Sequence, residues 1–329
     1  MSRILKFEKT PRIIATSTIC GPKEASGNLG KYIDKHLLDD YNNEKNFELA
    51  ERKMLSYTIE SVVEKCKLKM GDIDLYIGGD LLNQIISSSF CAREYSLPFL
   101  GVYTACATMA ESMIIGASLV NGGLINNCIC ATCSHFSTAE RQYRFPLDQG
   151  CTRPPQSQWT VTGAGANIIS NSASGVKITS ALVGRVIDYG VVDVNNMGAA
   201  MAPAVAHSLI EFFDETQSLP NQFDLILTGD LGSLGSRIFK EVIKRGGYSV
   251  DKNHVDCGEL IYNIEENEYQ GGSGAGCSAV VFNSYIYKKM VASELKRVLF
   301  IPTGALLSTV SSQQGESIPG IAHIIELGV

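Results

Sequence analysis

A cysteine at position 106 stands where the sequence predicts that a buried strand ends and a helix begins. We expect the strand over residues 97–103 and the helix over residues 107–120, which are small, apolar and nearly free of charge. A thiol in the first turn of a helix faces unpaired backbone N–H groups and the positive end of the helix dipole, which favour the thiolate. Cys106 is therefore a candidate nucleophile, and the alternative is a small buried side chain without chemistry.

A histidine lies just beyond the next predicted strand, residues 128–133. We expect His135 to face Cys106, where it either donates a hydrogen bond to a ligand or stabilises the thiolate. The alternative is a surface histidine that only packs against its neighbours. Three cysteines of the same strand superficially resemble a metal cluster with His135, namely Cys128, Cys130 and Cys133. Because the third of them points to the opposite face of a strand, we predict no metal site there.

The loop after His135 carries cations that are suited to an anionic ligand. Its arginines are Arg141, Arg144 and Arg153. Hydrogen bonds from charged donors contribute about 1.5–3 kcal/mol each, so two or three of them suffice to hold a small anion. We select Arg144 as a ligand contact. The alternative is that these arginines are solvated and paired with acidic residues of the loop, Glu140 and Asp148.

The composition is that of a globular protein with a large core. The chain has 329 residues, of which 45% are hydrophobic and 19% charged, and a net charge of −6. The absence of a basic run argues against a nucleic-acid partner. The ten cysteines are scattered through apolar segments with no secretory signal, which favours reduced thiols in a cytoplasm-like compartment. No apolar stretch reaches the ~20 residues of a membrane span, so we expect no transmembrane segment.

The second half of the chain repeats the pattern of the first. Residues 74–81, DLYIGGDL, are echoed by residues 224–231, DLILTGDL, and a helix-like segment precedes and follows each. Strands that alternate with helices predict mostly parallel sheets covered on both faces. We therefore expect an α/β fold of five layers, α/β/α/β/α, built from pseudo-repeated halves at residues 1–172 and 173–329, with helices 107–120 and 278–287 between the sheets.

Several motifs resemble the thiolase-fold condensing enzymes, the ketoacyl synthase and thiolase superfamily. They are the TACA turn at residues 104–107, the strand WTVTGAGA at 159–166 and the glycine loop FIPTGALL at 300–307. A closer resemblance is to the stage V sporulation protein AD family of endospore-forming bacteria. It rests on IGGDLLNQ at 77–84, QWTVTGAGA at 158–166, LTGDL at 227–231 and DCG at 256–258. This resemblance covers most of the chain.

The resemblance also shows where the enzyme pattern breaks. Condensing enzymes carry a histidine, and a second histidine or asparagine, that polarise the thioester carbonyl. At the matching positions this chain has Asp230 and Ser273. An aspartate beside the thiol raises its pKa by charge repulsion and opposes acyl transfer. Asp230, like Asp80 after the first-half strand, is alternatively a calcium ligand or a helix N-cap.

The resemblance implies a role in the uptake of dipicolinic acid into the developing spore. The expected ligand is dipicolinate, either free or with calcium, bound without a cofactor by Cys106, His135, Arg144, Asp230 and Ser273. The expected partners are membrane proteins of the same SpoVA system at the cytoplasmic face of the forespore inner membrane. We also expect a homodimer formed along the edge strand at residues 97–103. The alternatives are an active acyltransferase that uses Cys106, and a purely structural docking protein.

Overall fold

The computed structural model describes residues 3–143, 153–262 and 270–329. In these residues one twelve-stranded mixed sheet runs through the whole molecule. Its main path is β11 (His254–Asp256), β10 (Leu225–Thr228), β13 (Arg297–Ile301), β16 (Ile324–Gly328), β9 (Val176–Leu182), β2 (Arg12–Cys20), β8 (Gly163–Ser170), β6 (Asn127–Ser134), β4 (Leu75–Gly79) and β5 (Phe99–Gly101). The short strands β1 (Ile4–Lys6) and β3 (Lys35–His36) pair with β9 and β2.

The predicted repeat is visible in the order of the strands. From the centre outward, β2, β8, β6, β4 and β5 pair antiparallel, antiparallel, parallel and parallel, and β9, β16, β13, β10 and β11 follow the same sequence. Asp74 and Asp224 have matching roles, because each accepts two backbone N–H groups just before or at the start of the strand beside its own. The proposed boundary after residue 172 falls in the turn between β8 and β9.

The expectation of mostly parallel sheets is wrong. Antiparallel ladders join β13 to β16, β16 to β9, β9 to β2, β2 to β8 and β8 to β6. The strands that close the two halves, β8 and β16, run antiparallel to both of their neighbours, and the parallel pairs of the main path are confined to its outer strands. The β2–β9 pairing at Arg12 and Ile13 also joins what we expected to be two separate sheets.

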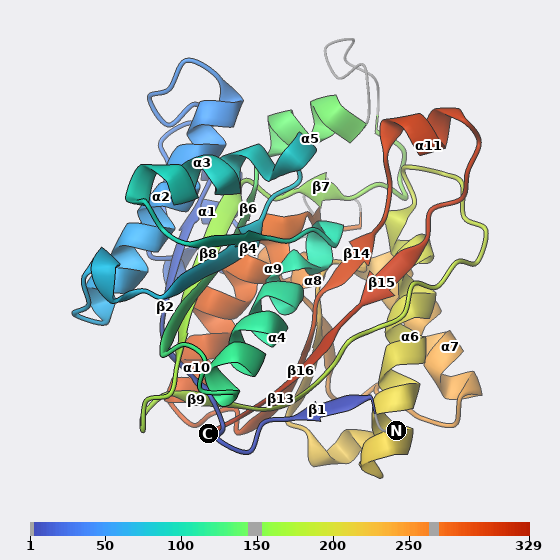
Figure 1. Ribbon diagram of the computed structural model, residues 1–329. Helices are drawn as coiled ribbons and strands as arrows, with labels where there is room; N and C mark the ends of the chain where they lie inside the picture. The colour runs from blue at the N-terminus through green and yellow to red at the C-terminus, as the bar shows by residue number, and fades with distance from the viewer. Residues whose placement is uncertain (1–2, 144–152, 263–269) are drawn as a thin grey trace.

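The five layers are as expected (Figure 1). One outer layer contains α2 (Phe47–Lys65) and α3 (Ile86–Tyr95), and the other contains α6 (Met197–Thr216) and α7 (Gly232–Arg245). The sheet has two wings, the first ending in β8, β6, β4 and β5 and the second in β16, β13, β10 and β11. Between these wings lie α4 (Thr108–Asn121) and α9 (Ala275–Val281). Strand alternation sorts the side chains, since Leu227 and Phe300 face this middle layer whereas Ile226 and Leu299 face α6 and α7.

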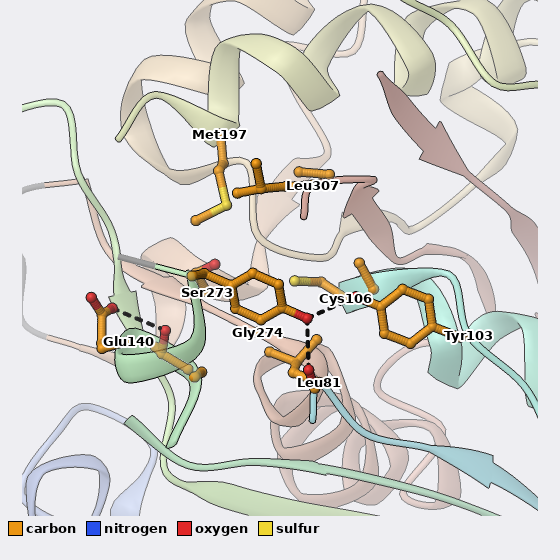
Figure 2. Close-up of a pocket in the computed structure, with 13 residues that line it drawn as sticks. Leu81, Tyr103, Cys106, Glu140, Met197, Ser273, Gly274 and Leu307 are labelled. Atoms are coloured by element: carbon orange, nitrogen blue, oxygen red, sulfur yellow. Dashed lines mark hydrogen bonds between the residues drawn. The ribbon is translucent and has the colours of Figure 1, made fainter. Parts of the chain in front are cut away.

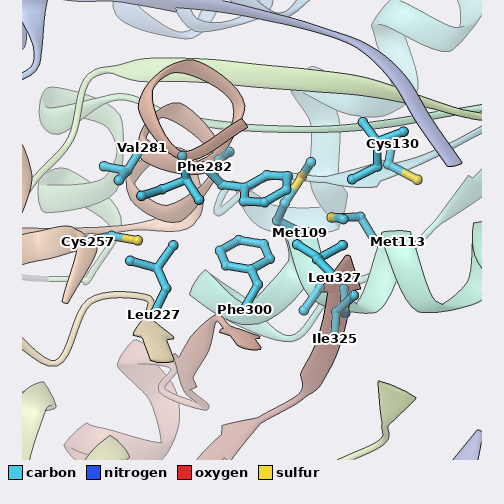
Figure 3. Packing of buried hydrophobic residues seen from close by; sticks show 14 of the residues in the cluster. Met109, Met113, Cys130, Leu227, Cys257, Val281, Phe282, Phe300, Ile325 and Leu327 are labelled. Carbon is cyan, nitrogen blue, oxygen red and sulfur yellow. The ribbon is translucent and has the colours of Figure 1, made fainter. Parts of the chain in front are cut away.

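The middle layer packs the two halves against each other (Figure 3). Phe282, from the π-helical turn Phe282–Ile286, stacks on Phe300 of β13 with ring centroids 4.4 Å apart. Met109 and Met113 of α4 belong to the same buried cluster, and all four side chains are 0% exposed. Cys128 and Cys130 face this cluster, whereas Cys133 faces α2, so the divergence expected along β6 is confirmed.

The edge of the sheet is also where the sequence places it. β5 ends the first wing and leaves Leu100 and Tyr103 more than 40% exposed, at 45% and 42%. The homodimer along this edge stays a prediction. Among the described residues, no helix combines the length and the apolar composition needed to cross a bilayer.

A buried carboxylate links the first and second halves. Glu24 of α1 (Pro22–Ala25) is 1% exposed, and it accepts hydrogen bonds from the backbone N–H of Thr162, at 3.0 Å, and from the Tyr262 hydroxyl. Burial raises the pKa of Glu24 from 4.5 to about 7, against the lowering effect of these donors. The charged form of Glu24 is therefore a cost to the folded state at neutral pH.

We predict that Glu24→Gln reduces the pH dependence of stability. A carboxyl whose folded pKa is raised contributes stability that is complete below its unfolded pKa and is lost as pH rises through about 7. Glutamine keeps an acceptor for Thr162 and Tyr262 but does not ionise. Urea unfolding at pH 5 and pH 8 should show a loss of stability on raising the pH that is smaller in the variant, by at most about 3 kcal/mol.

The exposed Glu241→Gln on α7 is the matched control and should leave the pH dependence unchanged. Parallel stability curves for the wild type and Glu24→Gln would contradict the assignment.

Candidate functional site

Cys106 lies on a short turn between β5 and α4 that holds its thiol inside the protein. The turn Ala105–Ala107 is a single 3-10 turn, and Ala105 has φ +52°, a left-handed conformation that is strained for alanine. The Thr108 hydroxyl stabilises the turn by donating to the carbonyl of Ala105 at 2.6 Å and accepting from the backbone N–H of Thr104 at 3.1 Å. Cys106 is only 7% exposed.

A glycine from the second half lets this turn approach the opposite wing. Gly304 lies in β14 (Thr303–Ala305), which pairs with β15 (Gly320–Ala322). A Cβ atom at Gly304 would lie 2.2 Å from the carbonyl oxygen of Thr104. Glycine is therefore required for the two halves to meet at Cys106, and the predicted glycine loop near the site has this steric role.

Asp230 follows β10 and turns its carboxylate toward Cys106. It is 1% exposed and accepts hydrogen bonds from the hydroxyls of Thr303, at 2.6 Å, and Ser273, at 3.2 Å, and from the backbone N–H of Gly274, at 3.0 Å. The Cys106 thiol also donates to this carboxylate. Burial raises the pKa of Asp230, and its four donors oppose that rise.

The thiol of Cys106 is held in its neutral form. Burial raises its pKa well above the usual value, and the nearby Asp230 carboxylate raises it further by charge repulsion. The backbone N–H of Gly274 and the hydroxyl of Ser273 act in the opposite direction but do not compensate. The expectation of a thiolate promoted by the helix dipole is thus wrong, whereas the expected effect of Asp230 is confirmed.

The thiol faces a small cavity (Figure 2). Its volume is about 40 Å³, and its lining is mainly apolar, with Ser273, Thr160 and Glu140 as polar members. The lining residues are Leu81, Tyr103, Ala105, Cys106, Ala139, Glu140, Tyr143, Thr160, Met197, Ser273, Gly274, Ala305 and Leu307. Both halves contribute, because the parallel pairing of β12 (Gly272–Ser273) with β7 (Trp159–Thr160) brings Ser273 and Thr160 together.

Glu140 is the ionisable carboxylate among the residues that line the cavity. It comes from α5 (Phe136–Tyr143) and is 2% exposed. Its carboxylate accepts a hydrogen bond from the Thr160 hydroxyl at 3.2 Å and pairs with the Arg153 guanidinium at 3.0 Å. The alternative that pairs the loop arginines with acidic residues holds for Arg153 and Glu140, but the pair is largely buried and not solvated as that alternative expected. Arg153 also stacks beside Trp159, at 5.2 Å from the ring centre, so the cation is fixed on the outer side of the cavity wall.

The structure brings together three of the five predicted ligand contacts. Cys106, Asp230 and Ser273 converge, whereas His135 does not line the cavity. The His135 ring packs against Phe47, with centroids 5.1 Å apart, and Nε2 lies 2.8 Å from the carbonyl oxygen of Asp40. Nδ1 accepts from the backbone N–H of Ser137 at 3.2 Å, which makes Nε2 the protonated nitrogen. Arg144 lies outside the described residues.

The two repeated aspartates have different partners. Asp80 accepts the backbone N–H groups of Leu82, at 3.0 Å, and Ser88, at 2.8 Å, so it binds the first turn of α3, but the expectation that it is the N-cap residue is wrong because Ile85 occupies that position. The same expectation for Asp230 is wrong, because the helix that follows it, α7, begins on the carboxylate of Asp256, which accepts from Leu231 and Gly232 at 2.9 and 3.0 Å. Asp230 is thereby left for the site.

Met197 and Thr303 are site residues that were not predicted from the sequence. Thr303 belongs to the glycine loop that the motifs placed near the site, so its hydroxyl was a detectable signal. Met197 begins α6 and has no chemical signal of its own. Only the packing of the second half against the first shows that it faces Cys106.

We predict that Asp230→Asn lowers the pKa of Cys106, because the variant removes the negative charge but keeps a polar side chain of the same size. The rate of Cys106 carbamidomethylation by iodoacetamide, followed by peptide mass spectrometry, should therefore rise at pH 8, and its pH profile should shift to lower pH. Asp251→Asn, on an exposed turn, is the control. An unchanged profile for Asp230→Asn would show that burial alone sets the pKa of the thiol.

Comparison of the sequence with known proteins identifies the family. The family described as stage V sporulation protein AD matches residues 1–328. The stage V sporulation protein AD of Bacillus subtilis (strain 168) is 43% identical over 317 residues, which cover 96% of this chain and 94% of the relative.

Solved structures with low identity show the same fold. The 3-oxoacyl-[acyl-carrier-protein] synthase III of Aquifex aeolicus VF5 has a TM-score of 0.60 at 13% identity, covering 97% of this chain and 100% of that chain. Cerulenin-bound OleA of Xanthomonas campestris has a TM-score of 0.63 at 11% identity, covering 99% and 98%. The chain is therefore a member of the stage V sporulation protein AD family, built on the thiolase fold of the ketoacyl synthases.

Proposed function

We propose that this protein is a non-catalytic receptor that binds dipicolinic acid at the Cys106 site and supports its uptake into the developing spore. We choose dipicolinic acid as the ligand because the chain belongs to the sporulation family and the resemblance implies this role for that family. The observation that carries the proposal is the contact of Cys106 with Asp230 and Ser273, in place of the imidazole and amide donors of a condensing enzyme.

The electrostatics of the site oppose acyl transfer. Attack on a thioester requires a thiolate and donors aimed at the developing oxyanion. Here the thiol is neutral, and the nearest charged group is a carboxylate, which repels both the thiolate and the oxyanion. None of the described residues that line the cavity is a histidine, lysine or arginine.

The same groups favour a ligand whose charge is compensated. A free dicarboxylate in the cavity would face the buried carboxylate of Glu140, with that of Asp230 behind Ser273 and Gly274, so both would repel it. Calcium bound to dipicolinate cancels the charge of the two carboxylates and leaves coordination positions that prefer carboxylate oxygens. Glu140 supplies such oxygens in the cavity wall, the Asp230 carboxylate adds negative charge behind Ser273 and Gly274, and the hydroxyls of Ser273 and Thr160 supply neutral hydrogen bonds. We therefore propose that the calcium chelate binds more tightly than free dipicolinate.

Isothermal titration with dipicolinate, with and without calcium, tests the proposal. We expect binding by the wild type and an affinity lower by about tenfold for Ser273→Ala, the loss of about one hydrogen bond to a charged group. Ser249→Ala, in an exposed loop, is the matched control. Absence of heat at millimolar ligand for the wild type, with and without calcium, would rule out the receptor.

Acyl transfer is the second candidate because of the turn at Cys106. Ala105, next to the cysteine, has a strained positive φ, and such strain is common in active sites. We expect no acyl adduct when the protein is incubated with acyl-CoA substrates of short and long chains, since the thiol is neutral and the cavity is small. Intact-protein mass spectrometry measures this directly, with Cys106→Ala as the control. A stoichiometric adduct that disappears in Cys106→Ala would reverse the assignment in favour of an enzyme.

A further inference from the structure

A second and larger space adjoins the Cys106 cavity. This outer groove has a volume of about 370 Å³, within the range of sites that hold small molecules. It is lined by Leu81, Leu82, Asn83, Gln84, Ile85, Gly101, Val102, Tyr103, Gln142, Tyr143, Leu307, Ser308 and Thr309. None of these described residues has a charged side chain. The groove therefore offers apolar surface, amides and hydroxyls.

The groove and the cavity share one wall. Leu81, Tyr103, Tyr143 and Leu307 line both spaces. The Tyr143 hydroxyl donates to the carbonyl of Leu81 at 2.6 Å and lies 2.8 Å from the Tyr103 hydroxyl, which is then the donor of the second bond. Figure 2 shows these two bonds crossing the space between Leu81 and Tyr103, beside the Cys106 sulfur. One hydrogen bond between side chains and one from a side chain to the backbone thus hold the wall closed.

The cavity behind this wall is too small for the proposed ligand. A volume of about 40 Å³ has room for about three water molecules, whereas dipicolinate has an aromatic ring and two carboxylates. The ligand reaches Cys106 only if the two spaces merge. Tyr103 is the most exposed of the four shared residues, at 42%, so its side chain has the most room to move.

The rim of the groove is strained. Gln84 and Ile85 have φ values of +57° and +48°, and a left-handed conformation is a strong outlier for a β-branched residue such as Ile85. Gly101 of β5 allows this arrangement, since a Cβ atom there would lie 2.3 Å from Cδ1 of Ile85. Ala105, in the cavity, is strained in the same way. Such outliers persist where the surroundings impose them, commonly at ligand sites.

We propose that the outer groove is a binding site for a small aromatic molecule without net charge and the route by which it reaches Cys106, with the Tyr103–Tyr143 hydrogen bond as a gate. The proposal rests on the proposed function for the identity of the ligand, but the route itself is independent of it. A groove without charged side chains accepts a metal-neutralised diacid and gives a free dianion no counter-charge.

Thiol labelling tests the gate without the ligand. The rate of Cys106 modification is measured by peptide mass spectrometry with bulky N-ethylmaleimide and with small iodoacetamide. Tyr143→Phe removes both hydrogen bonds of the wall, so we expect the maleimide rate to rise by about 5–30-fold. The iodoacetamide rate should rise by less than about twofold, because the small reagent depends less on the opening. Tyr189→Phe, on a distant exposed loop, is the control.

The comparison of two reagents separates access from reactivity. Both react with the thiolate, so a change in the pKa of Cys106 accelerates them equally, and an equal acceleration would overturn the gate. Unchanged rates with both reagents would overturn it as well.

A blocking variant tests the route. Thr309→Trp places a large side chain in the groove and should slow both reagents by at least about fivefold. Val310→Trp is the matched control, because Val310 is the next residue of α11 (Thr309–Gln313), is 62% exposed and does not line the groove. Equal rates for Thr309→Trp and the wild type would place the route elsewhere.

Protection by ligand distinguishes this inference from the proposed function. If calcium dipicolinate slows labelling of the wild type, both stand. If it gives no protection while Tyr143→Phe and Thr309→Trp behave as expected, the gate and the groove stand and dipicolinate is the wrong ligand.

Discussion

The site depends on one buried carboxylate that faces a buried thiol. A charge taken out of water costs several kcal/mol unless it is hydrogen-bonded, and Asp230 has three donors from the protein in addition to Cys106. These donors come from two segments of the second half, the β12–α9 junction and β14, and Asp230 itself lies in the turn after β10. The arrangement of these second-half segments around Cys106 therefore depends on their hydrogen bonds to Asp230. The same carboxylate also contributes to the raised pKa of the Cys106 thiol.

The duplicated fold explains how such a carboxylate became available. Asp80 and Asp230 occupy corresponding positions after β4 and β10, and both are buried. In the first half Asp80 serves the backbone of α3. In the second half Asp256, at the end of β11, takes over that task for α7. Because Asp256 binds the start of α7, the Asp230 carboxylate is available to face Cys106. Of the two equivalent positions, Asp80 therefore has a structural role and Asp230 a role in the site.

Features with a local or repeated signal were predictable from the sequence. The repeated DL…GDL segments located β4 and β10, the small residues of α4 and α9 located the middle layer, and alternation along β6 separated Cys128 from Cys133. The matched positions of Asp230 and Ser273 located the partners of Cys106. Each of these follows from periodicity or from a position in a motif, which the chain carries in consecutive residues.

Features that depend on contacts between distant segments were not predictable. His135 follows a strand that leads to the site, but its ring turns to Phe47 and Asp40, about ninety residues earlier in the chain. The helix dipole at Cys106 is a local effect, and burial together with Asp230 outweighs it. The antiparallel centre of the sheet arises from how the closing strands of both halves meet, which no single strand pattern contains.

Catalysis of a condensing reaction and binding of a metal-bound diacid require opposite properties of the residue at position 230. A condensing reaction accumulates negative charge at the sulfur and at the carbonyl oxygen, so the second half must contribute donors or positive charge. A receptor for a metal-bound diacid needs an acceptor there, because the cation is the part of the ligand that seeks oxygen atoms. The aspartate at this position raises the pKa of Cys106 and so opposes turnover, and under the proposed function its negative charge favours a cation-bound ligand. The thiol remains compatible with both, since in its neutral form it is a small, polarisable group that fills the cavity and donates to Asp230.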